Sequence, residues 1–112
     1  MTEPRPATGL LVSALIRRIE AEGGSAMVLA RGDAIAGALL LLLADRGVLS
    51  GIAERMWRFD GGYGLDFVGP TDPDKPGVAA DYIARRRKSD PDLWAVEIDH
   101  PEAERIAGEV LL

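Results

Sequence analysis

The chain of 112 residues has the size of one compact domain and leaves little room for a second. Apolar residues make up 47% and charged residues 28%, a composition that excludes a disordered tail and indicates a folded globular protein. The net charge of −5 disfavours a protein that binds nucleic acid or a membrane surface mainly by electrostatics, and the absence of cysteine excludes disulfides and thiolate sites.

The amino-terminal stretch 1–8 is polar and contains two prolines, so we expect it to be flexible. It lacks the basic start and apolar segment of a secretory signal. The longest apolar run, 34–44, is eleven residues long, whereas a membrane span needs roughly twenty. These features predict a cytoplasmic protein with no membrane partner.

The first regular element is an amphipathic helix. Apolar side chains recur at helical spacing at Leu11, Val12, Leu15, Ile16 and Ile19. The helix is predicted over 9–22, with Thr8 as its N-cap and Gly23-Gly24 as its end.

Four apolar stretches separated by turn residues follow the helix, at 25–31, 34–44, 48–59 and 63–68. Because Gly and Asp tolerate the positive φ angles that hairpins require, this spacing predicts an antiparallel meander of four strands. By propensity alone, 34–44 could equally form a helix. The hairpin spacing on both sides favours a strand that is buried on both faces.

The remaining elements are a loop, a helix, a strand and a short terminal helix. The segment 69–77 contains three prolines and is predicted to be a loop. Helical spacing resumes at Val78 and ends in the basic run 85–88, and the strand 93–98 precedes a short helix within 102–112. The sequence therefore predicts a single α+β domain over 1–112, with one or two helices on one face of an antiparallel sheet that includes the final strand.

Several segments resemble a known family, the small alphaproteobacterial domain of unknown function 1491. They are LVSALIRR at 11–18, ARGD at 30–33 with Ala36-Gly37, YIARR at 82–86, and DPDLWAVEI at 90–98. The DPDLW segment is the most specific, and the likeness covers most of the chain. The resemblance implies a bacterial, cytoplasmic protein of single-domain size, and it brings no activity, cofactor or functional residue.

The strongest local electrostatic feature is the basic run at the end of the second helix. Arg85, Arg86 and Lys88 are candidate residues for binding an anion or RNA phosphate. The alternative interpretation is that these cations complement the negative end of the helix dipole. Four consecutive residues also spread around the helix, so they cannot all contact one ligand.

Carboxylates are weaker candidates. Asp90 and Asp92 could hold a cation or act in acid–base chemistry, although Asp beside Pro is a common turn former. The lone histidine, His100, precedes Pro101 at a strand end, and no serine has the context of a nucleophile elbow. We therefore predict no catalytic residue, no metal ligand and no cofactor.

Trp57 and Trp94 are the candidate interface residues. If they face the core they are packing residues, and if one is exposed on the sheet it could anchor a partner.

Three functions remain open. The favoured hypothesis is a non-enzymatic protein-interaction or self-associating module that uses a sheet face or an edge strand, with a protein or a second copy as its partner. The second is an accessory protein that binds an anion or RNA through 85–88. The third is a small enzyme or ligand-binding protein that combines Asp90, Asp92 or Glu97 with Arg85 or Arg86.

Overall fold

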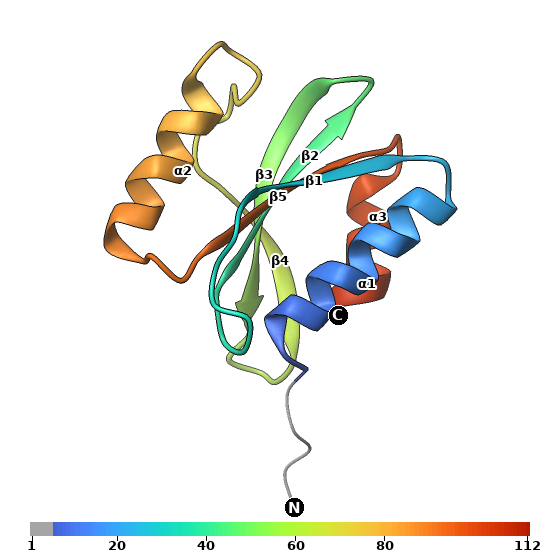
Figure 1. The fold of residues 1–112 in the computed structure, drawn as a ribbon, viewed down its shortest axis with the longest axis vertical. Coiled ribbons are helices and arrows are strands. Elements are labelled where there is room, and N and C mark those ends of the chain that lie inside the picture. The colour runs from blue at the N-terminus through green and yellow to red at the C-terminus, as the bar shows by residue number, and fades with distance from the viewer. Residues whose placement is uncertain (1–5) are drawn as a thin grey trace, which may run out of the picture.

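A computed structural model describes residues 6–112, so residues 1–5 of the stretch predicted to be flexible lie outside the described residues. Residues 6–112 form an α+β domain of three helices and a five-stranded mixed sheet (Figure 1). The elements are α1 (Thr8–Ala21), β1 (Ser25–Ala30), β2 (Leu39–Asp45), β3 (Val48–Trp57), β4 (Tyr63–Val68), α2 (Val78–Ser89), β5 (Trp94–Asp99) and α3 (Ala103–Leu111). The predicted α+β class is confirmed.

The strand order, β1-β5-β2-β3-β4, differs from the predicted four-stranded meander. The strands β2, β3 and β4 form the expected antiparallel hairpins. In the turn between β2 and β3, Arg46 and Gly47 have the positive φ angles that such turns require (52° and 80°). The prediction of a hairpin between β1 and β2 was wrong. The strand β5 lies between them, antiparallel to β1 and parallel to β2. Residues 31–38 form a crossing connection in which Asp33 accepts hydrogen bonds from the amides of Ile35 and Ala36, so β2 begins only at Leu39.

The leucine run explains why helices cover both faces of the sheet, rather than the single face that we predicted. Leu39, Leu41 and Leu43 point towards α1 and α3, whereas Leu40 and Leu42 belong to the cluster that α2 covers. Figure 1 shows α2 on one side of the sheet and α1 with α3 on the other. Each fully buried leucine contributes about 1.5–3 kcal/mol, so a strand that is apolar on both faces requires cover on both.

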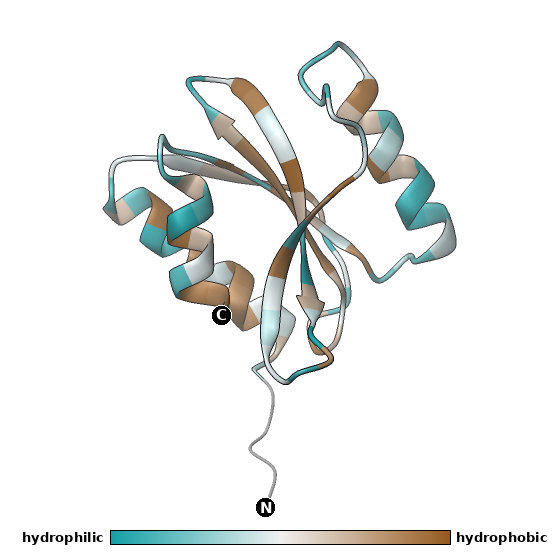
Figure 2. Cartoon of the chain, turned by 180° about the vertical axis from the view of Figure 1, so that it is seen from behind, coloured by the Kyte–Doolittle hydropathy of each residue, from teal (hydrophilic) through white to brown (hydrophobic). Residues whose placement is uncertain are grey.

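The two faces differ in how strongly they are covered. The helix α2 buries only Ala79 and Ile83, while α3 buries Ala103, Ile106, Ala107 and Leu111. Figure 2 shows α2 with hydrophobic colour at its beginning and mainly hydrophilic colour towards its end.

The start of α1 also differs from the prediction. Ala7, not Thr8, occupies the N-cap position, and Thr8 is a buried residue of the first turn. The amides of Thr8 and Gly9 donate to the carbonyls of Ile35 (3.2 Å) and Ala34 (2.9 Å), so the crossing connection supplies the acceptors that a capping side chain would provide. The Thr8 hydroxyl instead donates to the Gly37 carbonyl at 2.8 Å.

The other boundaries agree closely with the sequence. The loop 69–77 contains no helix or strand, and the short terminal helix is present as α3. Within residues 6–112, no helix has the length and apolar character needed to cross a bilayer.

Candidate functional site

The structure separates the members of the basic run. Arg86 donates to the Glu54 carboxylate (2.9 Å) and to the Tyr82 hydroxyl (2.9 Å), and the hydrogen bond to Glu54 is the main cause of its raised pKa. Arg87 donates to the backbone carbonyls of Leu93 and Arg31. These two guanidinium groups therefore attach α2 to β3 and to the start of β5.

The other two cations of the run remain at the surface. Arg85 and Lys88 are exposed, and neither forms an ion pair within residues 6–112. The Arg85 guanidinium lies 5.9 Å from the Tyr82 ring. Of the three predicted anion-binding residues, only these two are free to meet a ligand without breaking an internal contact.

Asp90 and Asp92 lie in the turn between α2 and β5. One carboxylate oxygen of Asp90 accepts a hydrogen bond from the Asp92 amide (3.2 Å), and the Asp92 carbonyl accepts one from the Asp33 amide (3.0 Å). No group of three or more metal-ligating side chains occurs in the described part of the chain. The structure does not bring these carboxylates into an ion pair with Arg85 or Arg86.

The segments that resemble the family form one contact region around this turn. The Trp94 indole donates to the Asp33 carbonyl at 2.7 Å. A Cβ at Gly32 would lie 2.6 Å from the Trp94 ring, and one at Gly37 would lie 2.9 Å from it, and both would overlap the Asp92 carbonyl. The motif residues at 32–37 and 92–94 therefore have a structural role: they let the crossing connection approach the start of β5.

The two tryptophans have different environments. Trp94 is 2% exposed and packs in the core with α1 and α3, so it is a packing residue and is not available to a partner in the folded chain. Trp57 is 56% exposed near the end of β3 and contacts the Tyr63 ring edge-on, with 5.1 Å between ring centroids. Only Trp57 of this pair is at the surface.

His100 connects the ends of two helices. Its Nδ1 accepts a hydrogen bond from the Glu102 amide (2.9 Å), and Nε2 lies 3.0 Å from the Glu22 carbonyl. With Nδ1 as the acceptor, Nε2 carries the proton and donates to Glu22. These contacts give the histidine a structural role at the junction of α1 and α3.

The sheet has an exposed edge that the sequence alone did not locate. Within the described chain β1 pairs with β5 alone, so its outer edge carries no strand. Met27, Val28 and Leu29 are 60%, 38% and 42% exposed. The strand, SAMVLA, contains no charged residue and no proline. Once the strand order is known, this composition identifies β1 as an edge that another strand can pair with.

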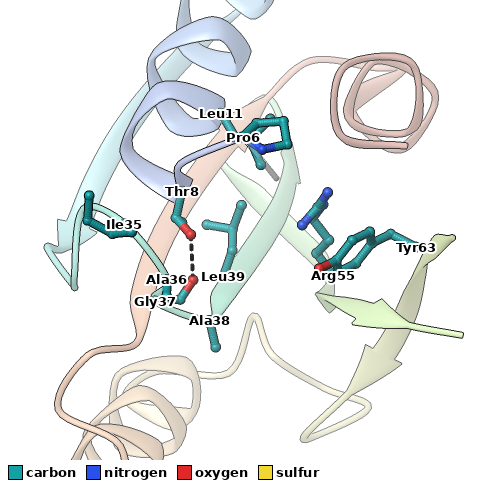
Figure 3. Close-up of a pocket in the computed structure, with 10 residues that line it drawn as sticks. All are labelled: Pro6, Thr8, Leu11, Ile35, Ala36, Gly37, Ala38, Leu39, Arg55 and Tyr63. Atoms are coloured by element: carbon teal, nitrogen blue, oxygen red, sulfur yellow. Dashed lines mark hydrogen bonds between the residues drawn. The ribbon is translucent and has the colours of Figure 1, made fainter. Parts of the chain in front are cut away.

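A pocket of about 310 Å³ lies between the start of α1, the 35–38 segment and the β3–β4 hairpin (Figure 3). One wall is formed by Arg55 and Tyr63, and the other by Thr8 and the 35–38 segment. Leu11, Leu39 and Pro6 complete the lining.

These features define a small α+β domain whose most distinctive surfaces are an apolar sheet edge and a cationic pocket. The chain belongs to the family described as protein of unknown function, DUF1491, whose model matches residues 7–108, and the predicted family resemblance is confirmed. Among curated proteins, none matches the chain.

Three solved structures with the same fold come from two bacteria. A crystal structure of a DUF1491 family protein from Caulobacter crescentus CB15 is 34% identical, with a TM-score of 0.76, over 89% of this chain and 92% of that one. A solution structure of a protein from A. tumefaciens is 29% identical, with a TM-score of 0.71, over 88% of each chain. An NMR structure of a DUF1491 family protein from Caulobacter crescentus CB15 is 32% identical, with a TM-score of 0.69, over 89% of this chain and 90% of that one.

Proposed function

We propose that this domain is a non-enzymatic self-associating module in which β1 pairs with β1 of a second copy. The observation that carries the proposal is the open outer edge of β1, which is uncharged and exposes Met27, Val28 and Leu29. An exposed apolar edge strand presents a row of backbone donors and acceptors that another strand can pair with.

The opposite edge of the sheet supports the choice of β1. The edge strand β4 carries Asp66, which forms an ion pair with Arg58 at 2.6 Å. A charge on an edge strand disfavours pairing with another chain. The strand β1 has no such charge, and only the bulge around Leu29 interrupts its ladder, which leaves Ser25–Val28 regular.

Symmetry favours an antiparallel second copy. A two-fold axis perpendicular to the sheet at this edge places the two identical β1 strands side by side in opposite directions, and it closes the assembly at a dimer. The charges before the strand do not select the arrangement, because Glu22 is already paired with Arg18 and Arg105.

The side chains of β1 add apolar contact to the backbone pairing. Met27 lies opposite Glu97 of β5, which in turn lies opposite Leu42, so Met27 is on the face that α2 covers in part. In an antiparallel dimer both copies of Met27 lie on the same face of the joined sheet. Burial of these exposed residues contributes roughly 25 cal/mol for each Å² removed from water.

The test is the mass of the full chain in solution by sedimentation velocity, from micromolar to millimolar concentration. We expect the mass to rise towards that of a dimer, and Met27→Lys to remain a monomer because it places two like charges on one joined face. Met56→Lys is the matched control, because Met56 is an exposed methionine of β3 (38%) away from this edge, and it should still dimerise. A wild-type chain that stays monomeric throughout, or a dimer that Met27→Lys leaves intact, would contradict the proposal.

A further inference from the structure

We infer that the pocket beside Arg55 is a binding site for a small monocarboxylate with an apolar body. The pocket is lined by residues from α1, the 35–38 segment, β2, β3 and β4, and by none from β1, so this site is independent of the proposed dimer edge. It is also separate from the basic run of α2.

Two contacts hold the Arg55 side chain in place. Its Nε donates to the carbonyl of Leu111 at 2.9 Å, near the end of α3, and its guanidinium lies 3.5 Å from the centroid of the Tyr63 ring. Arg55 forms no ion pair with any carboxylate of residues 6–112. Within residues 6–112 the Arg55 side chain donates a hydrogen bond only through Nε. The N–H groups of both terminal nitrogens are therefore available to a ligand.

The surroundings orient those donors. Figure 3 shows the Arg55 guanidinium beside the Tyr63 ring, across the pocket from Thr8 and the 35–38 segment. Stacking on one ring and bonding through Nε fix the plane of the group, which lowers the entropy lost when it binds a ligand. A guanidinium held in this way presents the paired N–H groups that match a carboxylate.

The other walls determine the rest of the ligand. Pro6, Leu11 and Ile35 supply apolar surface on part of the wall, and Thr8 and Tyr63 add polar groups to the lining. The volume of about 310 Å³ is at the lower end of the range for ligand pockets, so the ligand is small. Apolar side chains that lie next to polar lining and one oriented charge suit a ligand with a charged head and a short apolar body.

The charge count favours a single carboxylate over a phosphate. Among residues 6–112, Arg55 is the one cationic side chain that lines the pocket, and the whole chain carries a net charge of −5. One guanidinium neutralises one negative charge, and a phosphate dianion would keep a charge without a partner in this pocket.

The experiment is a titration of the ¹⁵N-labelled full chain with hexanoate, with the neutral hexanamide and with inorganic phosphate, followed by amide chemical shifts. Hexanoate should bind saturably and shift the amides of 35–38 and of Arg55, and hexanamide and phosphate should bind at least about tenfold more weakly. No saturable binding of hexanoate, or equal binding of hexanamide or phosphate, would overturn the inference.

Two variants and a control assign the binding to this pocket. Arg55→Met removes the cation, and Ala36→Phe fills the pocket from an exposed position while it keeps Arg55, so the second variant remains informative if the first loses its fold. Both should bind hexanoate at least about tenfold more weakly. Arg58→Met removes the neighbouring arginine of the hairpin, which pairs with Asp66, and should leave binding unchanged. Retention of binding in Ala36→Phe would refute the site.

Discussion

At the scale of single residues, two glycines determine how closely the crossing connection approaches β5. A Cβ at Gly37 would overlap the carbonyl of Asp92 and lie 2.8 Å from that of Asp33. Because both neighbours are backbone atoms, a larger residue cannot be accommodated by a side-chain rotation. The family-like residues around this turn are therefore explained by packing.

We predict that Gly37→Ala lowers the free energy of unfolding by about 2–4 kcal/mol, since the backbone must shift to relieve the overlap. Gly108→Ala is the matched control, because Gly108 is a residue of α3 with no atom close to an added Cβ. It should raise the free energy of unfolding by about 0.5–1 kcal/mol through its helix propensity. Urea denaturation measures both, and equal stability of Gly37→Ala and wild type would show that the approach is not tight.

A second residue-level feature is the ion pair between Arg86 and Glu54, whose side chains are 29% and 13% exposed. We predict that Glu54→Gln costs about 1–2 kcal/mol of unfolding free energy, because a partly buried guanidinium loses its charged partner. Asp66→Asn breaks the more exposed pair with Arg58 (42% and 46%) and should change the same quantity by less than about 0.5 kcal/mol. Similar effects of the two substitutions in thermal or urea unfolding would argue against an anchoring role for Arg86.

At the scale of elements, an ion-pair network joins α1 to α3. Arg105 pairs with Glu22 at the end of α1 (3.2 Å), with Glu102 at the N-cap of α3 and with Glu109 of α3. Arg18 pairs with Glu22 and Glu109. Hydrogen bonds from Arg18 and Arg105 lower the pKa of Glu22, those from Arg105 and Arg18 lower that of Glu109, and those from Arg105 alone lower that of Glu102.

The sign of the pH dependence follows from these lowered values. A carboxyl group with a lower pKa in the folded state stabilises the fold at pH values above its ordinary pKa of 4.5, and the stabilisation is lost as the pH falls through the folded-state value. We predict that Arg105→Gln has a lower Tm than wild type at neutral pH and that the difference closes well below pH 4.5. A gap that persists unchanged in acid would mean that Arg105 acts through packing.

The same scale shows what the sequence could predict. Periodicity and turn residues together predicted the type of all eight elements, because the burial of a helix face or a strand face depends on neighbours close in the chain. The second strand, predicted over 34–44, begins only at Leu39. The strand order was partly wrong, because the insertion of β5 beside β2 depends on contacts between residues far apart in the chain, such as Leu41 and Val96. The turn residues around 31–33 indicated that the chain changes direction there, but they did not show which strand β1 pairs with.

The candidate sites were predicted less well for the same reason. The sequence identified Arg86 as a cation, but its partner Glu54 lies 32 residues away. The open edge of β1 follows from the strand order, and the position of Arg55 in a pocket follows from the packing of α1 and α3 on one face. The sequence identifies the chemical type of each side chain, but it does not show the neighbours in space that determine what the side chain does.

At the scale of the whole molecule, the sheet has two unlike edges. One ends in β4, which carries a paired charge, and the other ends in β1, which is apolar. Such an asymmetry favours association through a single surface and therefore a closed dimer rather than a fibre.

The most direct measurement is a dilution series of ¹⁵N-labelled protein that follows every amide shift. The account predicts concentration-dependent shifts in 25–30 and in the adjacent β5, with none in β4, and their loss in Met27→Lys but not in Met56→Lys. Shifts that are absent, or that are confined to the exposed hairpin end around Trp57, would contradict a role for the β1 edge in self-association.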